Sequence, residues 1–589
     1  MKPEQFVAVT RLLIDNPNKT QRELAKETNM SLGLINSIIK TCQTEGKLEQ
    51  KDNQLILTTE GKNQLDSYRV KNAIILAAGF GSRFVPLTYE TPKGLLEVHG
   101  QSMIERQIEQ LHEKGITEIY VVVGYKKEKF DFLIDKYGVK LVFNAEYSTK
   151  NNLSSLYRVV SHLESTYLLM SDHYFEKNIF NTYEAKSWLS CRYFEGPTDE
   201  WCIKSTKSGR IESISIGGAD AFAMIGPAYL SPSLSEKLHL LVDDYYHRPG
   251  TSDMYWEQLL KDNLRSLEIY INDQNGNVYE FENLEELRLY DPSYNTASNN
   301  EIMETIATFY NISEDKIQNI APIKVGMTNR SFTFTYDGKK YIMRMPGEGT
   351  DKLINRQQEY ENFTVIKPLN ICDNMVFIDP ETGYKISEYI ENARVCDPLN
   401  IDDLQICMKR LKEFHNLKLK VNHTFDPFER IGFYESLWME PTAFRDYQET
   451  KENIMKLKPY LDNIEKEWVL AHIDAVPDNF LIIESGDEVE IRLIDWEYAG
   501  MQDPHIDIAM FSVYAMYEKQ QVDTLIDCYF EKKCPPETRI KIYAYVAVCG
   551  LLWSNWCEYK RHMGVEFGEY ALWQYRYAKD YYREIAGLV

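Results

Sequence analysis

"AIILAAGFGSRFVPLTYETPKG", residues 73–94, begins as an apolar strand and continues as a loop of small residues. Small residues after a strand let backbone N–H groups approach phosphates without obstruction by side chains. Arg83 and Lys93 follow, and fixed positive charge stabilises the negative charge that develops in phosphate chemistry. The loop lacks the third glycine of a dinucleotide-binding loop. The stretch therefore predicts a nucleotide site of another kind, with Arg83 and Lys93 as its catalytic cations.

Around this loop, apolar strands alternate with amphipathic helices. Examples are the strand "EIYVVVGY" at 118–125 and the helix "MIERQIEQLHEKG" at 103–115. Such alternation predicts a mostly parallel sheet covered by helices, a Rossmann-like α/β domain. Ligands of such sheets bind at the carboxyl ends of the strands, where Gly79 and Asp172 fall. We therefore expect residues 71–292 to form one nucleotide-binding domain.

Residues 1–70 predict three helices followed by a strand pair, which resembles a winged helix-turn-helix. Ser31–Glu45 takes the position of the recognition helix, and Lys40 is its one cation. Because DNA binding depends on neutralised phosphates, this nearly neutral segment favours a docking or dimerising role. DNA binding by residues 1–70 remains the less favoured alternative, and a homodimer remains open.

Composition limits the class of protein. The 589 residues contain 66 Lys and Arg against 89 Asp and Glu, a formal net charge of -23. An acidic chain repels nucleic acid and anionic membranes. The 10 Cys show no metal-ligand spacing, the N-terminus lacks the apolar core of a signal peptide, and the apolar runs are too short to span a bilayer. We expect a cytoplasmic protein with reduced thiols and no membrane association.

A second part of the chain follows the polar stretch "YDPSYNTASNNE" at 290–301, which reads as a linker. "KVGMTNRSFTFTYDGKKYIMRMP" at 324–346 alternates as antiparallel strands, and the remainder is mainly helical. A small β-rich lobe, about 300–390, followed by a larger helical lobe, about 391–589, is the outline of a bilobal protein-kinase-like fold. The chain is thus predicted to be a multidomain protein of α/β and α+β type.

"HIDAVPDN", residues 472–479, has the form H-x-D-x-x-x-x-N, and "LIDWEYAG" follows at 493–500. This pairing suits phosphorylation of a hydroxyl. Asp474 is expected to orient the attacking hydroxyl and accept its proton, while Asn479 and Asp495 are expected to bind Mg²⁺. His472 is interpreted as a structural support.

Further residues are predicted to contact the two nucleotides. Arg344 is a phosphate ligand on a strand, and Glu359 is its expected ion-pair partner. The remaining candidates lie in two loops: Ala77, Ala78, Gly79, Gly81 and Ser82 in the first, and Gly326, Thr328 and Asn329 in the second.

The first loop resembles that of the sugar-nucleotidyltransferase superfamily. "NLSSLY", "SDHYF", "DEWCIK", "SDMYWEQLLKDN" and "GNVYEFEN" narrow the resemblance to bacterial CTP:phosphocholine cytidylyltransferases of the Lic type, over residues 71–290. The resemblance implies CTP as substrate and Mg²⁺ held by Asp172 and Asp253. It departs from the family at Gly94, where Ala is common, and at His173, where Asn is usual.

The same resemblance implies a site for the trimethylammonium group of phosphocholine. Such a group cannot donate N–H hydrogen bonds, so aromatic faces and a carboxylate hold it. Trp201, Tyr255 and Glu280 lie in the matching blocks. The alternative interpretation is a core Trp and Tyr with a surface Glu.

Residues 300–589 resemble the choline and ethanolamine kinase family in its bacterial Lic-type branch. In "GLLWSNWCEY", at 550–559, Trp553 and Trp556 are three residues apart and share one helix face. The family likeness implies a choline cage closed by Tyr498 and Trp496, and the alternative is a packed helix face.

Together these resemblances imply two consecutive reactions. Choline and ATP would give phosphocholine, and phosphocholine and CTP would then give CDP-choline and pyrophosphate. The alternatives are the same two steps on ethanolamine, or a choline-responsive DNA-binding regulator with degenerate enzyme domains.

Overall fold

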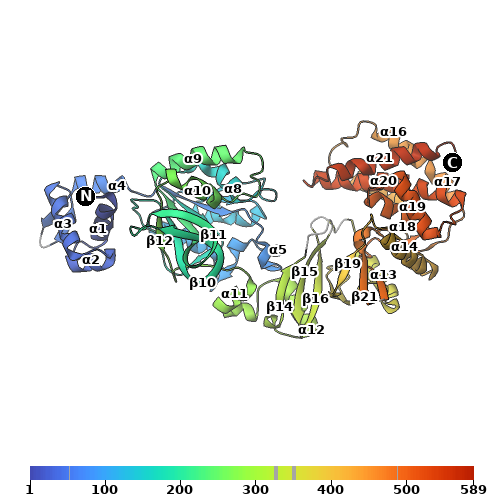
Figure 1. Ribbon diagram of the computed structural model, residues 1–589, viewed down its shortest axis with the longest axis horizontal. Helices are drawn as coiled ribbons and strands as arrows, with labels where there is room; N and C mark the ends of the chain where they lie inside the picture. The colour runs from blue at the N-terminus through green and yellow to red at the C-terminus, as the bar shows by residue number, and fades with distance from the viewer. Residues whose placement is uncertain (52–53, 324–328, 348–349, 351–352, 487) are drawn as a thin grey trace. The chain divides into compact units, whose positions relative to one another are not determined.

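The computed structural model describes residues 1–51, 54–323, 329–347, 350, 353–486 and 488–589. These residues form two compact units, Met1–Ile317 and Gln318–Val589 (Figure 1). The division lies downstream of residue 300, at which the sequence places the start of the kinase-like part, because the intervening residues pack with the first unit.

The first unit opens with a small helical module and a two-stranded wing. The side chains of Thr20 and Ser31 cap the second and third helices by accepting the backbone N–H groups of Glu23 and Leu34. Apolar side chains from every element form its core. The predicted winged helix-turn-helix is confirmed. Its elements are α1 (Pro3–Asp15), α2 (Gln21–Thr28), α3 (Leu32–Thr44), β1 (Leu48–Lys51), β2 (Gln54–Leu57) and α4 (Thr59–Asp66).

A seven-stranded sheet forms the centre of the first unit, in the order β12-β10-β11-β8-β3-β6-β7. The four strands at one side are parallel: β8 (Thr166–Met170), β3 (Asn72–Ala77), β6 (Ile119–Val123) and β7 (Lys140–Phe143). Beyond β8 lies a long antiparallel hairpin: β11 (Ile211–Leu230) and β10 (Trp188–Ser205), with β12 (Tyr270–Asp273) parallel to β10. The predicted Rossmann-like sheet is confirmed.

Helices cover both faces of this sheet. Ile74 and Leu76 of β3 face one core, while Ala73 and Ile75 face the other, as expected for the two-residue period of a strand. The first core includes α8 (Asn152–Val159), α9 (Pro232–Tyr246) and α10 (Trp256–Asn263). The second includes α6 (Met103–Glu113) and α7 (Phe132–Tyr137).

The carboxyl ends of β3 and β8 lie side by side. Leu76 pairs with Met170, and the N–H of Ser171 donates to the carbonyl of Leu76 at 3.0 Å. The loop after β3 therefore faces the residues that follow β8. Those residues form β9 (His173–Phe175), which pairs antiparallel with β13 (Val278–Glu280).

The stretch at 290–301 is not a linker, contrary to the sequence prediction. It follows α11 (Leu284–Tyr290) and precedes α12 (Glu301–Tyr310). The Tyr294 hydroxyl donates to the carbonyl of Glu97 at 2.7 Å, and the Asp291 carboxylate accepts the N–H of His99 at 2.7 Å. These contacts fasten the polar stretch to the first unit.

The second unit begins with an antiparallel sheet in the order β14-β15-β16-β18-β17. Its strands are β14 (Gln318–Pro322), β15 (Asn329–Tyr336), β16 (Lys339–Pro346), β17 (Met375–Ile378) and β18 (Lys385–Glu388). Helix α13 (Arg356–Ile366) lies between β16 and β17 in the chain. The predicted small β-rich lobe is confirmed.

A helical lobe follows and contains a small three-stranded sheet and one further strand pair. The strands are β19 (Ala393–Val395), β20 (Val469–Ala471), β21 (Phe480–Ser485), β22 (Glu488–Leu493) and β23 (Gly500–Gln502). The helices are α14 (Ile401–Asn416), α15 (Pro427–Ser436), α16 (Tyr447–Met455), α17 (Leu457–Asn463), α18 (Ile506–Tyr514), α19 (Lys519–Phe530), α20 (Pro536–His562) and α21 (Glu569–Ile585). One large apolar core joins them. This arrangement is the predicted kinase-like fold.

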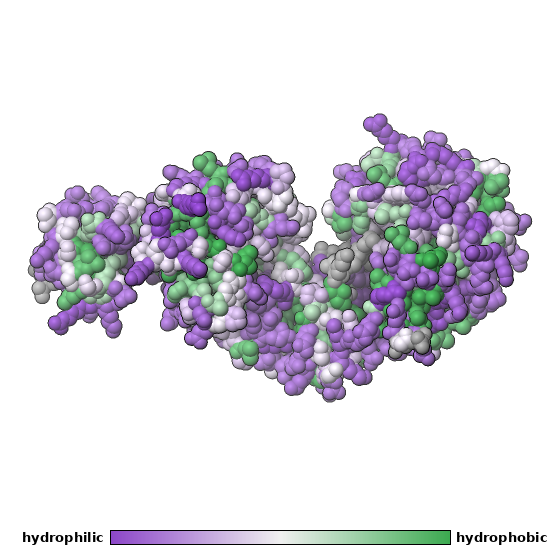
Figure 2. Space-filling view, viewed as in Figure 1, coloured by the Kyte–Doolittle hydropathy of each residue, from purple (hydrophilic) through white to green (hydrophobic). Residues whose placement is uncertain are grey.

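The face of the molecule in Figure 2 is mostly hydrophilic, with smaller apolar groups over both units. Within the part of the chain that the structure describes, no helix combines the length and apolar composition needed to cross a membrane.

Helices α20 and α21 approach each other closely at Gly550. A Cβ added there would lie 2.7 Å from the carbonyl oxygen of Gln574 and 2.8 Å from the backbone nitrogen of Ala578. Gly550→Ala should therefore destabilise the second unit by about 1 to 3 kcal/mol, because backbone must shift to admit the methyl group. Gly432→Ala in α15 is the control, since its Cβ would meet no atom within 4 Å.

Calorimetric unfolding of the two variants measures the difference. The control should be neutral or stabilised by up to about 1 kcal/mol, since alanine is the better helix former. Equal stabilities would contradict the close approach at Gly550.

Candidate active sites

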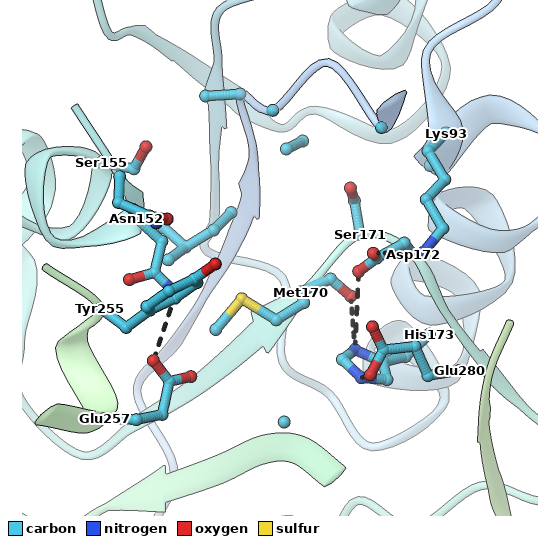
Figure 3. Close-up of a pocket in the computed structure, with 18 of the residues that line it drawn as sticks. Lys93, Asn152, Ser155, Met170, Ser171, Asp172, His173, Tyr255, Glu257 and Glu280 are labelled. Atoms are coloured by element: carbon cyan, nitrogen blue, oxygen red, sulfur yellow. Dashed lines mark hydrogen bonds and ion pairs between the residues drawn. The ribbon is translucent and has the colours of Figure 1, made fainter. Parts of the chain in front are cut away.

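A cavity of about 470 Å³ lies at the carboxyl ends of β3 and β8 (Figure 3). The structure brings ten of the predicted residues to its wall. These are Ala77, Ala78, Gly79, Gly81, Arg83, Lys93, Asp172, Trp201, Tyr255 and Glu280. Ser82 and Asp253 are not among the lining residues.

The glycines of the first loop have two different roles. Gly81 has φ +69°, and a Cβ there would lie 3.0 Å from Cβ of Lys93 and 3.1 Å from Cγ2 of Thr88. Gly81 is therefore needed for backbone conformation and packing. A Cβ at Gly79 would meet no atom within 4 Å, so this glycine borders open space in the cavity wall. That space suits a phosphate approached by backbone N–H groups.

Lys93 is the fixed cation of the cavity. It belongs to a 3₁₀ turn after Pro92, is buried, and places Nζ 2.8 Å from Oδ2 of Asp172 and 4.9 Å from the centre of the Phe84 ring. Burial raises the pKa of Asp172, but Lys93 and His173 outweigh it and hold the pKa below its usual range. Asp172 is thus a carboxylate, paired with an ammonium group that also faces the nucleotide loop.

Packing against Ser171 explains why residue 94 is a glycine in this chain. A Cβ there would lie 2.6 Å from both Cβ and Oγ of Ser171, the residue before Asp172. Ser171 therefore occupies the space that an alanine at position 94 would need. The departure from the family pattern at Gly94 leaves the approach of Lys93 to Asp172 intact.

The cavity wall also contains aromatic and acidic side chains. Trp201, Tyr255 and Glu280 line it, and so do Glu200 and Glu257, which the sequence interpretation missed. The expected metal ligand Asp253 is exposed and lies outside the lining. Glu257, in the first turn of α10, takes its place in the wall, because the turn of the helix brings residue 257 to the cavity (Figure 3).

Among the described residues, no Lys, Arg or His forms an ion pair with Glu257. The side-chain nitrogen of Asn152 lies 3.3 Å from its Oε2, and burial raises the pKa of Glu257 to about 7. A cation bound in the cavity would restore its charge. The sequence feature that could have pointed to Glu257 is the predicted site residue Tyr255, which lies two residues earlier on the same turn.

His173 lies between the two carboxylates Asp172 and Glu280. Its ring is 2% exposed, and its Nδ1 lies 3.3 Å from the carbonyl oxygen of Met170. Burial lowers the pKa of the ring, but Glu280 and Asp172 outweigh it and raise the pKa. His173 is therefore enclosed by acceptors on both ring nitrogens.

In the second unit, Arg344 of β16 and Glu359 of α13 form the predicted ion pair, with Nη2 2.6 Å from Oε1. Nη1 of Arg344 lies 3.4 Å from Oδ1 of Asp495. All three side chains are largely enclosed. Arg344 thus connects the β-rich lobe with the predicted metal ligand.

The loop after β20 brings Asp474 and Asn479 together. Nδ2 of Asn479 donates to Oδ2 of Asp474 at 3.1 Å and to its carbonyl at 2.8 Å. Burial first, then the charges of Asp495 and Glu497, raise the pKa of Asp474 well above its ordinary value. The group is therefore suited to accept a proton from a hydroxyl held beside it.

Glu497 and Arg356 belong to the same cluster and were missed from the sequence. Glu497 accepts a hydrogen bond from Nδ2 of Asn329 at 2.9 Å and lies 3.4 Å from Nη1 of Arg356. Burial raises the pKa of Glu497 to about 7. Gly326 and Thr328, predicted beside Asn329, lie outside the described residues.

His472 is a structural support, as predicted. Its ring is fully buried, its Nε2 lies 2.9 Å from the carbonyl of Ile494, and burial lowers its pKa to about 4. The side chain that organises this loop is Asp507 of α18, which was missed. Oδ2 of Asp507 accepts the N–H of His472 at 2.9 Å, and Oδ1 accepts the N–H of Ile473 at 2.7 Å.

This clamp holds an unusual backbone. Ile473 has φ +69°, a region that a β-branched residue occupies only at a cost of about 1–3 kcal/mol. His415 fixes the clamp in turn, since its Nε2 lies 2.9 Å from Oδ2 of Asp507. The position of Asp474 therefore depends on a buried carboxylate in another helix.

Three of the four predicted cage aromatics lie together. The ring centres of Tyr498 and Trp553 are 5.9 Å apart, and those of Trp553 and Trp556 are 5.4 Å apart. Trp556 is buried and Trp553 is half-buried. Phe567, which was not predicted, lies 5.1 Å from Trp556.

Trp496 is not part of this group, and the prediction for it was wrong. It is fully buried, and its Nε1 donates to the carbonyl of Leu493 at 2.7 Å. Its ring packs against Phe414 at 4.9 Å and His472 at 4.4 Å. Trp496 belongs to the core behind the loop, because the chain at Asp495 turns it inward with φ +66°.

Both sites fit the ligand chemistry of Mg²⁺. Among the described residues, no three His, Cys, Asp or Glu side chains are placed so that they could hold a metal ion by themselves. Mg²⁺ in nucleotide sites uses one or two carboxylates and completes its shell with phosphate oxygens and water. Asp172 in the first unit, and Asp495 with the side-chain oxygen of Asn479 in the second, offer oxygen donors of this kind.

Asp507→Asn should lower the turnover of phosphoryl transfer in the second unit about tenfold or more, because one of the two clamped N–H groups loses its acceptor. Steady-state kinetics measures this. Nucleotidyl transfer in the first unit serves as the internal control and should not change. Unaltered phosphoryl transfer would contradict the clamp.

Trp553→Ala should weaken substrate binding, whereas Trp496→Ala should lower the stability of the fold. Loss of the Trp553 face should raise the KM of a cationic alcohol up to about tenfold, the scale of a cation–π contact. Loss of Trp496 should lower the free energy of unfolding by about 3–5 kcal/mol, since it leaves a cavity in the core. Kinetics and calorimetry on both variants test the assignment, and a substrate-specific effect of Trp496→Ala alone would reverse it.

Three family models match the chain. Residues 320–572 match choline/ethanolamine kinase, residues 73–181 match the MobA-like NTP transferase domain, and residues 11–49 match a winged helix-turn-helix DNA-binding model. The matches follow the three predicted parts in order.

Similar proteins cover the two enzyme parts separately. A choline-phosphate cytidylyltransferase of Streptococcus pneumoniae is 38% identical over 217 residues, 37% of this chain and 95% of the relative. A 2-aminoethylphosphonate cytidylyltransferase of Lancefieldella rimae is 37% identical over 228 residues, 38% of this chain and 93% of the relative. The protein LicA of Haemophilus influenzae is 27% identical over 260 residues, 42% of this chain and 95% of the relative. In this chain, a nucleotidyltransferase of the choline-phosphate cytidylyltransferase type is joined to a choline/ethanolamine kinase part and an N-terminal winged helix-turn-helix. The chain therefore belongs to the Lic-type family.

Proposed function

We propose that this chain makes CDP-choline from choline in two steps. The second unit transfers a phosphoryl group from ATP to choline, and the first unit transfers the cytidylyl group of CTP to the resulting phosphocholine. The observation that carries this proposal is the cavity of the first unit. Its wall combines Lys93 and the small-residue loop, which suit a triphosphate, with Trp201, Tyr255 and Glu280, which suit a cation.

In the kinase step, the choline hydroxyl oxygen attacks the γ-phosphorus of ATP, and the bond to the β-phosphate oxygen breaks to release ADP. The hydroxyl proton passes to Asp474, whose raised pKa suits a proton acceptor. Arg344 neutralises phosphate charge. Asn479 and Asp495 would hold Mg²⁺, which supplies positive charge beside the transferred group.

In the cytidylyl step, a phosphate oxygen of phosphocholine attacks the α-phosphorus of CTP, and pyrophosphate leaves. No general base is needed, because a phosphomonoester is already anionic at pH 7. Lys93 and Arg83 stabilise the charge that builds on the α-phosphate and on pyrophosphate. Asp172 would hold Mg²⁺, which would supply positive charge beside the phosphates.

Arg83 lies in the wall of the cavity. Its side chain is largely exposed and forms an ion pair with Glu282, which also lines the cavity. An arriving triphosphate competes with Glu282 for the guanidinium. Lys93 is buried, so it supplies the permanent charge of the site.

The presence of a kinase part favours a phosphate ester as acceptor. The relative that acts on 2-aminoethylphosphonate has a substrate with a carbon–phosphorus bond, and a kinase does not make such a bond. Aromatic walls in both units favour a trimethylammonium over a primary ammonium, which would need hydrogen-bond acceptors around its three N–H groups. The ethanolamine pair of reactions is the remaining enzyme alternative.

The winged helix-turn-helix is proposed to dock another protein surface. Helix α3 carries Lys40 as its one cation, which provides little charge for a DNA backbone. The regulator alternative has less support, because both units keep their charged groups, among them Lys93, Asp172, Asp474 and Asp495.

A phosphorus NMR time course with choline, ATP, CTP and Mg²⁺ tests the two steps. The wild-type chain should form phosphocholine first, then CDP-choline and pyrophosphate. Asp474→Asn should stop phosphocholine formation but still convert supplied phosphocholine. Lys93→Ala should make phosphocholine but slow cytidylyl transfer about a hundredfold or more. Loss of both activities in either variant would contradict two independent sites.

Parallel time courses test the head group. Choline should exceed ethanolamine in kcat/KM by about tenfold or more, the scale of a desolvated cation–π site. 2-Aminoethylphosphonate with CTP should react more slowly than phosphocholine. Faster reaction with ethanolamine or with the phosphonate would replace choline as the assigned substrate.

A further inference from the structure

His173 and Glu280 are directly opposite each other on paired strands. β9 and β13 run antiparallel with His173 in register with Glu280, and Nε2 of His173 lies 3.5 Å from Oε2 of Glu280. The imidazole is 2% exposed, whereas the Glu280 side chain keeps 36% exposure and lines the cavity. A buried ring therefore contacts a carboxylate that faces the ligand space (Figure 3).

Backbone atoms enclose the imidazole ring of His173. Gly226 of β11 has φ +95°, and a Cβ there would lie 2.3 Å from Cε1 and 2.7 Å from Nε2 of the imidazole. Nδ1 lies 3.3 Å from the carbonyl of Met170. Nε2 of Gln107 donates to the carbonyl of His173 at 2.8 Å and to that of Met170 at 2.9 Å. Neither the ring nor its backbone can move without disturbing several elements.

The ring of His173 also lies between two carboxylates, Asp172 and Glu280, for which different roles are proposed. Nδ1 of His173 lies 3.9 Å from Oδ1 of Asp172, which pairs with Lys93 on its other oxygen. Asp172 is thus held beside Lys93. Glu280 lies beside the other ring nitrogen and lines the same cavity as Trp201 and Tyr255.

We propose that His173 is a positioning residue that fixes the Glu280 carboxylate toward the cationic head group of the acceptor and so sets acceptor affinity. The inference rests on the proposed cytidylyl transfer to phosphocholine. A half-exposed Glu side chain loses rotamer freedom when it binds a ligand, and this entropic cost falls when a fixed partner holds it beforehand. The ring contacts Oε2, which leaves Oε1 for the head group.

Two substitutions at position 173 separate positioning from packing. The side-chain amide of Gln can reach the place of Nε2 beside Glu280, whereas that of Asn reaches only the place of Nδ1 beside Met170. His173→Asn should raise the KM for phosphocholine about tenfold, the value of one charge-assisted contact, and change the KM for CTP less than about twofold. His173→Gln should recover most of the acceptor affinity.

A double-mutant cycle with Glu280→Gln gives the decisive measurement. If His173 acts through Glu280, His173→Asn should add less than about twofold to the acceptor KM once Glu280 is Gln. Gly226→Ala, which displaces the ring without changing it, should reproduce the phenotype of His173→Asn. It replaces that variant in the cycle if His173→Asn does not fold, as judged by calorimetry.

The outcomes separate the hypotheses. Wild-type protein that fails to convert phosphocholine would end the proposed function itself, before any variant is compared. With an active wild type, three results would overturn the role of His173: equal effects on both substrates, no advantage of Gln over Asn, or the full effect of His173→Asn in the Glu280→Gln background.

Discussion

Asp495, Glu497 and Glu359 lie around the guanidinium groups of Arg344 and Arg356, and the charges of Asp495 and Glu497 also act on Asp474, so negative charge exceeds positive charge in this cluster. The excess raises the pKa of Asp474 and Glu497. A similar imbalance occurs in the first unit, where burial raises the pKa of Glu257 and no ion pair to it occurs within the described part of the chain. Because unpaired buried charge is costly, both sites are electrostatically complementary to cations. In the proposed reactions, a nucleotide with Mg²⁺ and an onium head group would supply them.

Backbone geometry in the second unit serves this charge arrangement. Ile473 and Asp495 both have positive φ; the first precedes the proposed proton acceptor Asp474, and the second is the predicted metal ligand. Such conformations persist only when the surroundings hold them. Asp507 does so for Ile473 through two backbone N–H groups. The stability of the core behind the loop, including Trp496, is thus coupled to the placement of the reactive carboxylates.

The sequence predicted the fold classes, and the structure brings together residues of its sharp motifs, Lys93 with Asp172 and Asp474 with Asn479. Their roles remain predictions. The sequence interpretation placed Asp253 in the wall instead of Glu257, since four residues at the start of a helix decide which carboxylate faces the cavity. Trp496 was misplaced for a related reason: one positive φ at Asp495 reverses the direction of the next side chain. Asp507 contacts the backbone of Ile473, and Gly226 lies against the ring of His173. In both contacts the partners are far apart in the sequence, so no single motif contains both of them.

The docked stretch around Tyr294 has a practical meaning for separating the two enzymes. Ile302, Met303 and Ile306 of α12 are buried, and α12 belongs to Met1–Ile317. A kinase fragment cloned from residue 300 would expose these apolar side chains to water and invite aggregation. Cloning from Gln318 would leave them with their own partners. The boundary that matters to an expression experiment is therefore defined by helix packing, and the polar composition of the preceding segment is a misleading guide to it.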